Sequence, residues 1–549
     1  MADLLICDAE LGGWNSDVRL REGIVVEIGA LAAGACETIL EARGGALLPG
    51  LHDHHIHVAA TAAARASVAC GPPDVRDEAM LRMALARTGE GWLRGIGYHE
   101  SVAGMLDRRW LDDAVPNRPV RIQHRSGRMW FLNSRALDLV LASGLPAPAS
   151  LDRATGKLFD SDAWLRAALG GTWPAFAPVG TELARYGITG LTEMSPANDD
   201  AVAAHFAGEC ARGGLPQRVT IAGTLALGAR GLDPALVLGP VKLHLHEAHL
   251  PDFAATVATI RAARERARAV AFHCVSEVEL VYALAALGEA GPAQGDRIEH
   301  ASVVPHHLIA GIVASGAAVV AQPHFVGERG DAYLADIEPE QWPGLYRLAS
   351  LAEAGIPLAG GSDAPFGQTN PWAAMAAAVS RRTADGRVLG ESESLTPEAA
   401  LALFLADPTD LTRIRTIAVG APADLCLLDR PWADAREDLT AGLVRVTIID
   451  GQIVHQRVDQ TPAQRCSGRD TPAREHQERG ALAADPARQR NGAAESGDHP
   501  HRELGQLEPR APGGDQAIGE RCKFKPRTDA GAVHFDGETA VAPKQRPRG

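Results

Sequence analysis

The chain has 549 residues, 46% of them hydrophobic and 22% charged, which is the balance of a globular protein and not of a fibrous or disordered one. Its 54 Lys and Arg against 68 Asp and Glu give a net charge of −14, which argues against a nucleic-acid partner because binding phosphates requires clustered cations. No apolar run approaches the roughly 18–20 residues that a membrane helix needs, so we expect no membrane partner. The eight cysteines are scattered, which favours reduced thiols and a cytoplasmic protein.

Short β-type segments occupy both ends of the patterned region. They read DLLICDAEL, DVRLREGIVVEIG and ETILEARGGALL near the start, and ADLCLLDRPW and LVRVTIIDGQIVHQR near residue 450. The Asp-Gly pair in IDGQIV is typical of a β-hairpin turn. We therefore expect residues 1–48 and 412–458 to form one composite β-sandwich module.

Residues 49–411 alternate apolar β-type runs with Ala- and Leu-rich helical stretches, such as the helical patterns at 253–269 and 277–291. Strand–helix–strand repeats at this spacing predict parallel βαβ units, and a long series of them predicts an α/β protein with a (β/α)₈ TIM-type barrel. There are more strand-like runs than eight, so at least one of them belongs to an insertion or an outer element.

The pattern stops after about residue 458. Residues 459–549 are rich in Pro, Gly, Arg and Gln and hold almost no aliphatic clusters. Such a composition cannot bury enough apolar surface to offset chain entropy. We expect a disordered C-terminal tail.

The stretch PGLHDHHIH places four histidines within six positions, directly after an apolar run. His55 and His57 are two residues apart, so at the end of a strand they can direct two imidazoles at one metal ion. His52 and His54 point to the other face or lie in a turn. A polar loop that is merely rich in histidine is the alternative.

Further polar residues end later β-type runs. Lys242, His273, His300 and Asp363 follow one another at intervals of 31, 27 and 63 residues. One βα unit of a barrel takes roughly 30 residues, so these residues fall on successive strands with one strand skipped before Asp363. The carboxyl ends of barrel strands are where catalytic groups converge.

Lys242 is one of two lysines before the tail, in a chain that otherwise uses Arg. A bare ammonium within a barrel strand is costly. A primary amine can take up CO₂ to form a carbamate, which bridges two metals as an anion, whereas Arg cannot. An ion-paired lysine is the alternative.

The motifs PGLHDHHIH, VK, FH, IEH and GSDAP resemble the amidohydrolase superfamily, and its amidohydrolase 3 group, which includes N-substituted formamide deformylases and YtcJ-like enzymes, most closely. The resemblance covers about residues 1–458 and implies a segment inserted into the barrel around residues 99–180. It implies that His55, His57 and Asp363 hold one metal, that His273 and His300 serve a second, and that Lys242 is a carbamylated bridge. It also implies that the protein binds one or two divalent metal ions, with zinc as the expected metal.

Asp363 is then the catalytic group that moves the proton of an activated water, and His300 or His273 steadies the developing oxyanion if only one metal is bound. Five residues are candidates for contacts with the substrate, and they are His124, Arg128, His244, His246 and His324. Arg128 stands where many relatives have His.

These residues predict a metal-dependent hydrolase of a carbon–nitrogen bond, as in an amide, N-formyl or cyclic amide group, acting on a small molecule. One alternative is a decarboxylase or isomerase that uses the same metal site. The other is a metal-binding protein without catalytic activity. A homodimer is the expected assembly.

Overall fold

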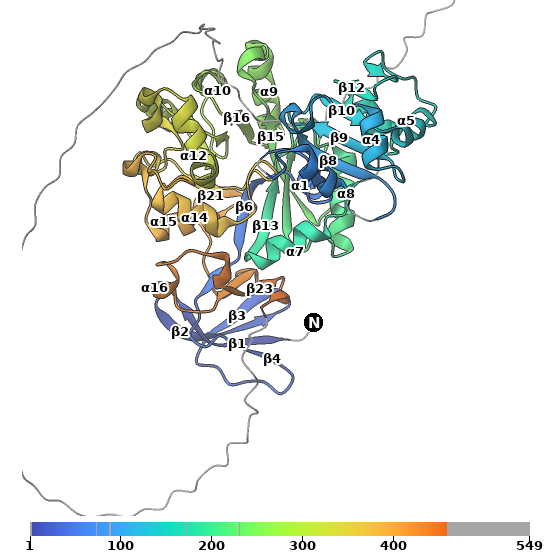
Figure 1. The fold of residues 1–549 in the computed structure, drawn as a ribbon. Coiled ribbons are helices and arrows are strands. Elements are labelled where there is room, and N and C mark those ends of the chain that lie inside the picture. Colours follow the sequence, from blue (N-terminus) through green and yellow to red (C-terminus); the bar gives the residue numbers. More distant parts are fainter. Residues whose placement is uncertain (1–2, 73, 87–88, 172, 230, 458–549) are drawn as a thin grey trace, which may run out of the picture. The chain divides into compact units, whose positions relative to one another are not determined.

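The computed structural model describes residues 3–457 except 73, 87–88, 172 and 230 (Figure 1). The predicted tail, 459–549, lies outside the described residues. No helix in the described part of the chain is long and apolar enough to cross a membrane.

A parallel, eight-stranded sheet forms the centre of the fold, in the order β19-β18-β17-β16-β15-β14-β13-β6 (Figure 1). Its strands are β6 (Leu51–Ile56), β13 (Ile188–Glu193), β14 (Arg218–Gly223), β15 (Leu236–Leu243), β16 (Val270–Cys274), β17 (Arg297–His300), β18 (Ala318–Ala321) and β19 (Leu358–Gly360). All neighbouring pairs run parallel, as the alternating pattern predicts. The prediction of a TIM-like barrel is confirmed.

Helices connect the barrel strands and pack their apolar faces on them. They are α1 (Val58–Arg65), α7 (Ala177–Arg185), α8 (Asp200–Ala211), α9 (Phe253–Glu265), α10 (Glu277–Ala290), α11 (Ile309–Ser315), α12 (His324–Asp336), α13 (Ala349–Glu353), α14 (Pro371–Ser380) and α15 (Pro397–Leu405). Several of these helices begin at a polar N-cap residue. The Asp199 and Asp252 side chains accept backbone N–H groups in the first turns of α8 and α9. Ser276 and Glu279 form a capping box on α10.

The barrel closes between β19 and β6, the two strands at the ends of the sheet order. The backbone N–H of Asp363 donates to His55 O at 2.7 Å, and that of His57 donates to Ala364 O at 2.9 Å. Gly361 lies against the His55 backbone so closely that a Cβ atom there would sit 2.6 Å from His55 N. The seam therefore joins the two segments that carry His55, His57 and Asp363.

Two four-stranded sheets come from the two ends of the patterned region. One has the order β3-β2-β1-β4, with β1 (Leu4–Leu11), β2 (Trp14–Arg21), β3 (Ile24–Gly29) and β4 (Thr38–Glu41). The other has the order β24-β23-β22-β5, with β5 (Leu47–Pro49), β22 (Leu425–Leu428), β23 (Val444–Ile449) and β24 (Gln452–Gln456). Ile6 and Val18 of the first share a hydrophobic core with Leu425 and Ile448 of the second.

The predicted hairpin is present between β23 and β24. Its central residues Asp450 and Gly451 have φ of 52° and 73°. Positive φ at both positions is the requirement of a type I′ turn, which matches the twist of the flanking strands. A short helix, α16 (Trp432–Ala435), precedes β23.

A further, six-stranded sheet accounts for the surplus strand-like runs. It has the order β11-β12-β10-β9-β8-β7, with β7 (Val68–Ala69), β8 (Leu93–Tyr98), β9 (Val120–His124), β10 (Met129–Leu132), β11 (Leu151–Asp152) and β12 (Lys157–Phe159). Five helices accompany it: α2 (Glu78–Leu85), α3 (Glu100–Ala103), α4 (Arg108–Ala114), α5 (Ser134–Leu141) and α6 (Asp162–Ala168). The segment predicted as an insertion around residues 99–180 therefore contributes β9 to β12 to this sheet, which also includes β7 and β8 before residue 99.

Candidate metal centre

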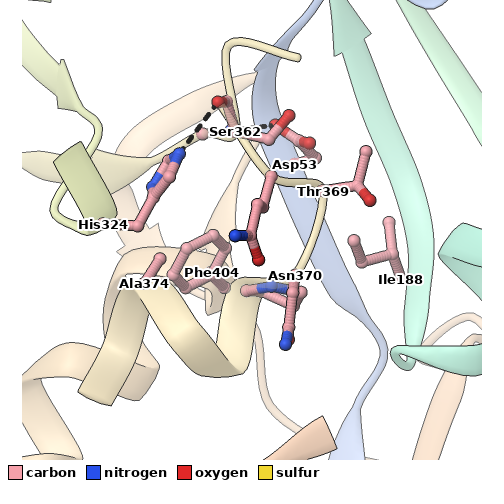
Figure 2. Close-up of a pocket in the computed structure, with 11 residues that line it drawn as sticks. Asp53, Ile188, His324, Ser362, Thr369, Asn370, Ala374 and Phe404 are labelled. Carbon is pink, nitrogen blue, oxygen red and sulfur yellow. Dashed lines mark hydrogen bonds between the residues drawn. The ribbon is translucent and has the colours of Figure 1, made fainter. Parts of the chain in front are cut away.

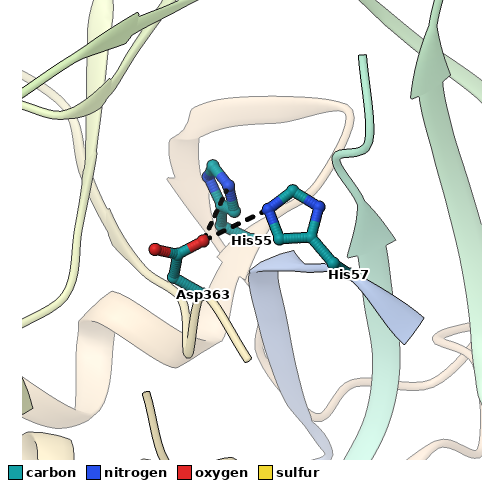
Figure 3. Close-up of side chains that lie close together, drawn as sticks. All are labelled: His55, His57 and Asp363. Atoms are coloured by element: carbon teal, nitrogen blue, oxygen red, sulfur yellow. Dashed lines mark ion pairs between the residues drawn. The ribbon is translucent and has the colours of Figure 1, made fainter. Parts of the chain in front are cut away.

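His55, His57 and Asp363 meet at the carboxyl end of the barrel (Figure 3). His55 lies in β6, His57 directly follows it, and Asp363 comes three residues after β19. The Asp363 Oδ1 atom lies 3.2 Å from His57 Nε2 and 3.5 Å from His55 Nε2. Within the described part of the chain this is the group of three potential ligands whose atoms all lie within 4.8 Å of one another.

The outer ring nitrogens of both histidines are held by other residues. His55 Nδ1 lies 2.6 Å from Glu299 Oε2, and His57 Nδ1 lies 3.0 Å from Ser195 Oγ. A carboxylate on Nδ1 fixes the tautomer that leaves Nε2 as a free acceptor, which is the usual arrangement of metal-bound histidines. The donor set of two Nε2 atoms and a carboxylate oxygen therefore fits a divalent metal such as zinc.

Glu299 is completely buried, and its charge is balanced by Arg297 two residues earlier in β17. Arg297 Nε donates to Glu299 Oε1 at 2.7 Å, and its Nη2 donates to His54 O at 2.7 Å. Arg297 thus ties Glu299 to the backbone of β6. The ring of His55 is oriented by a carboxylate that is itself held in place.

The Asp363 carboxylate is also buried. Burial raises its pKa, but the imidazoles of His300, His57 and His55 lower that pKa by more. The pKa of His55 falls well below its ordinary value, first through burial and then through Lys242. A metal requires an ionised carboxylate and neutral imidazole ligands, and the lowered pKa values of Asp363 and His55 favour that state.

Asp53 links the same two segments without joining the cluster (Figure 2). Its Oδ1 accepts the backbone N–H of Ser362 at 2.9 Å and that of His55 at 3.1 Å. Burial raises its pKa to about 6. In the same small pocket the buried His324 places Nε2 3.0 Å from Ser362 O. Both residues therefore position the loop before Asp363.

Lys242 lies in β15, buried within the barrel. Its Nζ atom has no hydrogen-bond partner among the described residues. Burial lowers its pKa to about 8, although Glu299 acts in the opposite direction. A buried amine without a hydrogen-bond partner is costly. Burial of the Lys242 Nζ atom is therefore explained only by a group that it binds or carries and that the described residues do not supply.

His273 lies one residue before the end of β16, and His300 is the last residue of β17. Their rings lie 4.5 Å apart, and the His300 ring lies 4.7 Å from that of His55. His300 Nδ1 lies 2.8 Å from Gln322 Oε1 and 4.0 Å from Asp363 Oδ2. Burial lowers the pKa of both imidazoles. The barrel therefore brings both rings beside the His55–His57–Asp363 cluster.

The backbone is strained at this end of the barrel. His300 and Asp363 have φ of 70° and 51°, and Ala301 has 45°. Such left-handed conformations are uncommon outside glycine and cluster at functional sites. At His300 the change of direction allows both Glu299 and His300 to face the cluster, although they are neighbours.

A profile of the amidohydrolase 3 group, described as an amidohydrolase family, matches residues 38–455. The chain belongs to this amidohydrolase family. The resemblance predicted from HDHHIH, VK, FH, IEH and GSDAP is confirmed. With the His55–His57–Asp363 cluster, the chain is a member of the amidohydrolase superfamily that carries a candidate site for a divalent metal.

This amidohydrolase is 29% identical to the Bacillus subtilis protein named "Putative amidohydrolase YtcJ" over 208 residues, which are 36% of this chain and 39% of that relative. It is 24% identical to the N-substituted formamide deformylase of Arthrobacter pascens, with 83% of this chain and 99% of the relative covered. The structure of an uncharacterized metal-dependent hydrolase from Pyrococcus furiosus matches with a TM-score of 0.64 and 20% identity, covering 78% of this chain and 99% of that one. The structural match shows a shared fold.

The other candidate residues of the amidohydrolase lie in different places. The His244 ring stacks on His273 at 4.4 Å. His246 is exposed and accepts the N–H of Ala248 in its own turn. β15 ends at Leu243, so the two-residue alternation of a strand, which would place His246 on the same face as Lys242, does not reach His246.

The two candidates of the inserted segment pair with local acids. His124 Nε2 lies 2.9 Å from Glu100 Oε2. Arg128 is exposed and makes a two-pronged contact with Asp160, through Nε at 2.8 Å and Nη2 at 2.6 Å. In this structure neither residue joins the metal-site cluster.

Sequence reasoning did not single out Glu299, Ser195 or Gln322, which contact His55, His57 and His300. Glu299 carried a signal, since a carboxylate directly before His300 in a buried β-type run needs a partner. Ser195 and Gln322 follow or end barrel strands but are common polar residues. His52 and His54 lie in β6 and not in a turn, and His52 Nε2 contacts Thr192 Oγ1 at 2.9 Å.

Proposed function

We propose that the chain is a metal-dependent hydrolase that cleaves a carbon–nitrogen bond, as in an amide, N-formyl or cyclic amide group, of a small molecule. The convergence of His55 Nε2, His57 Nε2 and the Asp363 carboxylate at the catalytic end of a barrel carries the proposal. The likeness to an N-substituted formamide deformylase over nearly its whole length supports this bond type.

The roles of the residues follow from their surroundings. A divalent metal, when bound, lowers the pKa of water from 15.7 to about 7 and polarises a carbonyl. His55 and His57 would hold it through Nε2, while Glu299 and Ser195 keep their rings in place. Asp363 is ionised and would accept a proton and return it to the leaving nitrogen.

His300 is placed to stabilise negative charge on the substrate oxygen. Its Nδ1 faces Gln322 and, at 4.0 Å, Asp363, and its ring lies between those of His55 and His273. Because Nδ1 donates to Gln322 Oε1, a proton for the oxyanion would have to sit on Nε2, in the imidazolium form, and a hydrogen-bond donor aimed at a developing oxyanion is worth about 10²–10³ in rate.

Lys242 would carry a carbamate formed when its amine adds CO₂ and releases a proton. The unpartnered Nζ beside His55, His273 and His300 supports this. Metal-free protein loaded with zinc in ¹³C-bicarbonate is expected to show a carbamate carbonyl signal that Lys242→Arg lacks. The absence of this signal in the wild type would leave Lys242 as a free amine.

The activity is tested with a panel of N-substituted formamides, linear amides and cyclic amides, by detecting the released acid and amine. Asp363→Asn, which keeps the size of the side chain, is expected to lose turnover by several orders of magnitude. Exposed Asp385→Asn serves as the control. Release of CO₂ from carboxylated compounds, with no cleavage of any amide, would favour a decarboxylase, and no reaction in either panel would contradict the proposal.

A further inference from the structure

A second cavity lies at the opposite end of the barrel from the metal centre. Its volume is about 400 Å³. It is lined by residues at the amino ends of β15, β16, β17 and β18, and by the hairpin of β20 (Ala406–Asp407) and β21 (Asp410–Ile414). Catalytic groups of such barrels gather at the carboxyl ends, so this cavity is separate from the site described above.

Positive charge on its wall is not neutralised by protein carboxylates. The buried Arg268 guanidinium donates only to backbone carbonyls, at 2.8–3.2 Å, which are those of Thr224, Leu227, Gly239 and Pro240. Arg266, two residues earlier, is exposed and donates to Leu225 O at 2.8 Å. Among the described residues no carboxylate pairs with either guanidinium.

The two arginines are held side by side by an unusual turn. Ala267 between them has φ of 53°, a conformation that an alanine rarely adopts. Burial and the neighbouring Arg266 both lower the pKa of Arg268, which shows that the two charges repel each other. A bound anion would offset the repulsion between the like charges at this cavity wall.

The other charged residues of the cavity offset this charge only in part. Asp410 contributes one negative charge against the two arginines, and its Oδ1 accepts from Thr412 N at 3.1 Å and from Thr412 Oγ1 at 2.6 Å. Arg297, which also lines the cavity, is matched by Glu299. The partly exposed Val237 and Leu238 supply apolar surface on the same wall.

We propose that this cavity binds a small organic carboxylate, with the anionic group on Arg266 and Arg268 and the apolar part on Val237 and Leu238. Arg268 has most of its donors committed to carbonyls, so Arg266 supplies the free donors and Arg268 the uncompensated charge. The proposal does not rest on the proposed hydrolysis, although Arg297 both lines this cavity and contacts Glu299 beside the metal centre.

The test uses 4,4,4-trifluorobutyrate as probe on the full-length, metal-free chain, with binding followed by ¹⁹F NMR at constant ionic strength. Arg266→Gln is expected to weaken binding about tenfold, the effect of losing one charge-assisted hydrogen bond. Val237→Glu, which adds a repelling charge at an exposed position, is expected to abolish it. Arg261→Gln on α9, an exposed arginine outside the cavity, is the matched control and is expected to bind like the wild type.

No binding by the wild type would overturn the proposal. Binding that persists unchanged in Arg266→Gln and Val237→Glu would also overturn it, because the probe would then sit elsewhere. Circular dichroism and melting curves verify that each variant is folded. Metal-loaded protein is expected to give the same affinity, so a failed hydrolase assay leaves this result intact.

Discussion

At the scale of single residues, the ligand histidines are controlled by groups that do not touch the metal position themselves. Glu299 is buried, contacts His55 Nδ1 and is matched by Arg297, so three charged or polar groups share one low-dielectric space. Such a network is stable only when every member is satisfied, and removing one partner of a buried pair costs about 3–5 kcal/mol. Glu299 is therefore a positioning residue for His55.

Glu299→Gln is expected to weaken metal binding by about 10–100-fold, because the amide accepts from His55 Nδ1 without the charge that makes the ring a strong ligand. Competition with a chromophoric chelator measures the affinity directly. Glu289→Gln, on the exposed face of α10, is the control. Equal affinities of Glu299→Gln and the wild type would show that the contact plays no part in metal binding.

His324 predicts a dependence of stability on pH. Burial lowers its pKa to about 4, against about 6.5 in the unfolded chain. The unfolded state therefore binds the proton first, and the stability contributed by neutral His324 is complete above pH 6.5 and is lost as the pH falls towards 4. The loss is about 3 kcal/mol.

His324→Gln keeps a donor for Ser362 O but does not titrate. Urea unfolding of the metal-free chain between pH 7 and 4 is expected to show a shallower loss of stability in this variant than in the wild type. The exposed His307→Gln is the control. Parallel pH curves for wild type and His324→Gln would contradict the assignment.

At the scale of elements, the metal centre depends on the seam between β19 and β6. The two segments are joined by the Asp363 N–H to His55 O bond, by the His57 N–H to Ala364 O bond and by Asp53 Oδ1. Gly361 allows the close approach, since any side chain there meets the His55 backbone. The distance between Asp363 and the histidines is thus set by backbone packing.

Gly361→Ala is expected to push the β19 end away from β6 and to reduce metal affinity more strongly than it reduces stability. Its Cβ atom would lie 2.6 Å from both His55 Cβ and His55 N. Gly288→Ala in α10, where a Cβ meets nothing within 4 Å, is the matched control. Unaltered metal affinity in Gly361→Ala would show that the seam tolerates widening.

At the scale of the whole molecule, the sequence predicts the barrel and the order of its polar strand ends well. The intervals from Lys242 to His273, His300 and Asp363 correspond to β15, β16, β17 and the residue group after β19, with β18 skipped. This success has a physical reason, because a βα unit has a nearly constant length and parallel strands all end on one face.

The features of the site that the sequence pattern does not predict depend on backbone geometry. Alternation puts Glu299 and His300 on opposite faces, but the positive φ of His300 brings both to the cluster. The same alternation puts His246 beside Lys242, although β15 has already ended. Arg128 meets Asp160, 32 residues later, and such a long-range pair has no signature in the sequence.

The central claim is that His55, His57 and Asp363 bind a divalent metal. The most direct test is to purify the wild type and His57→Ala without chelator and to measure their metal content by elemental analysis. The account predicts at least about one divalent ion per wild-type chain and a loss of metal in the variant, with the exposed His307→Ala unchanged. A wild-type chain free of metal, or a His57→Ala chain that retains the full content, would contradict it.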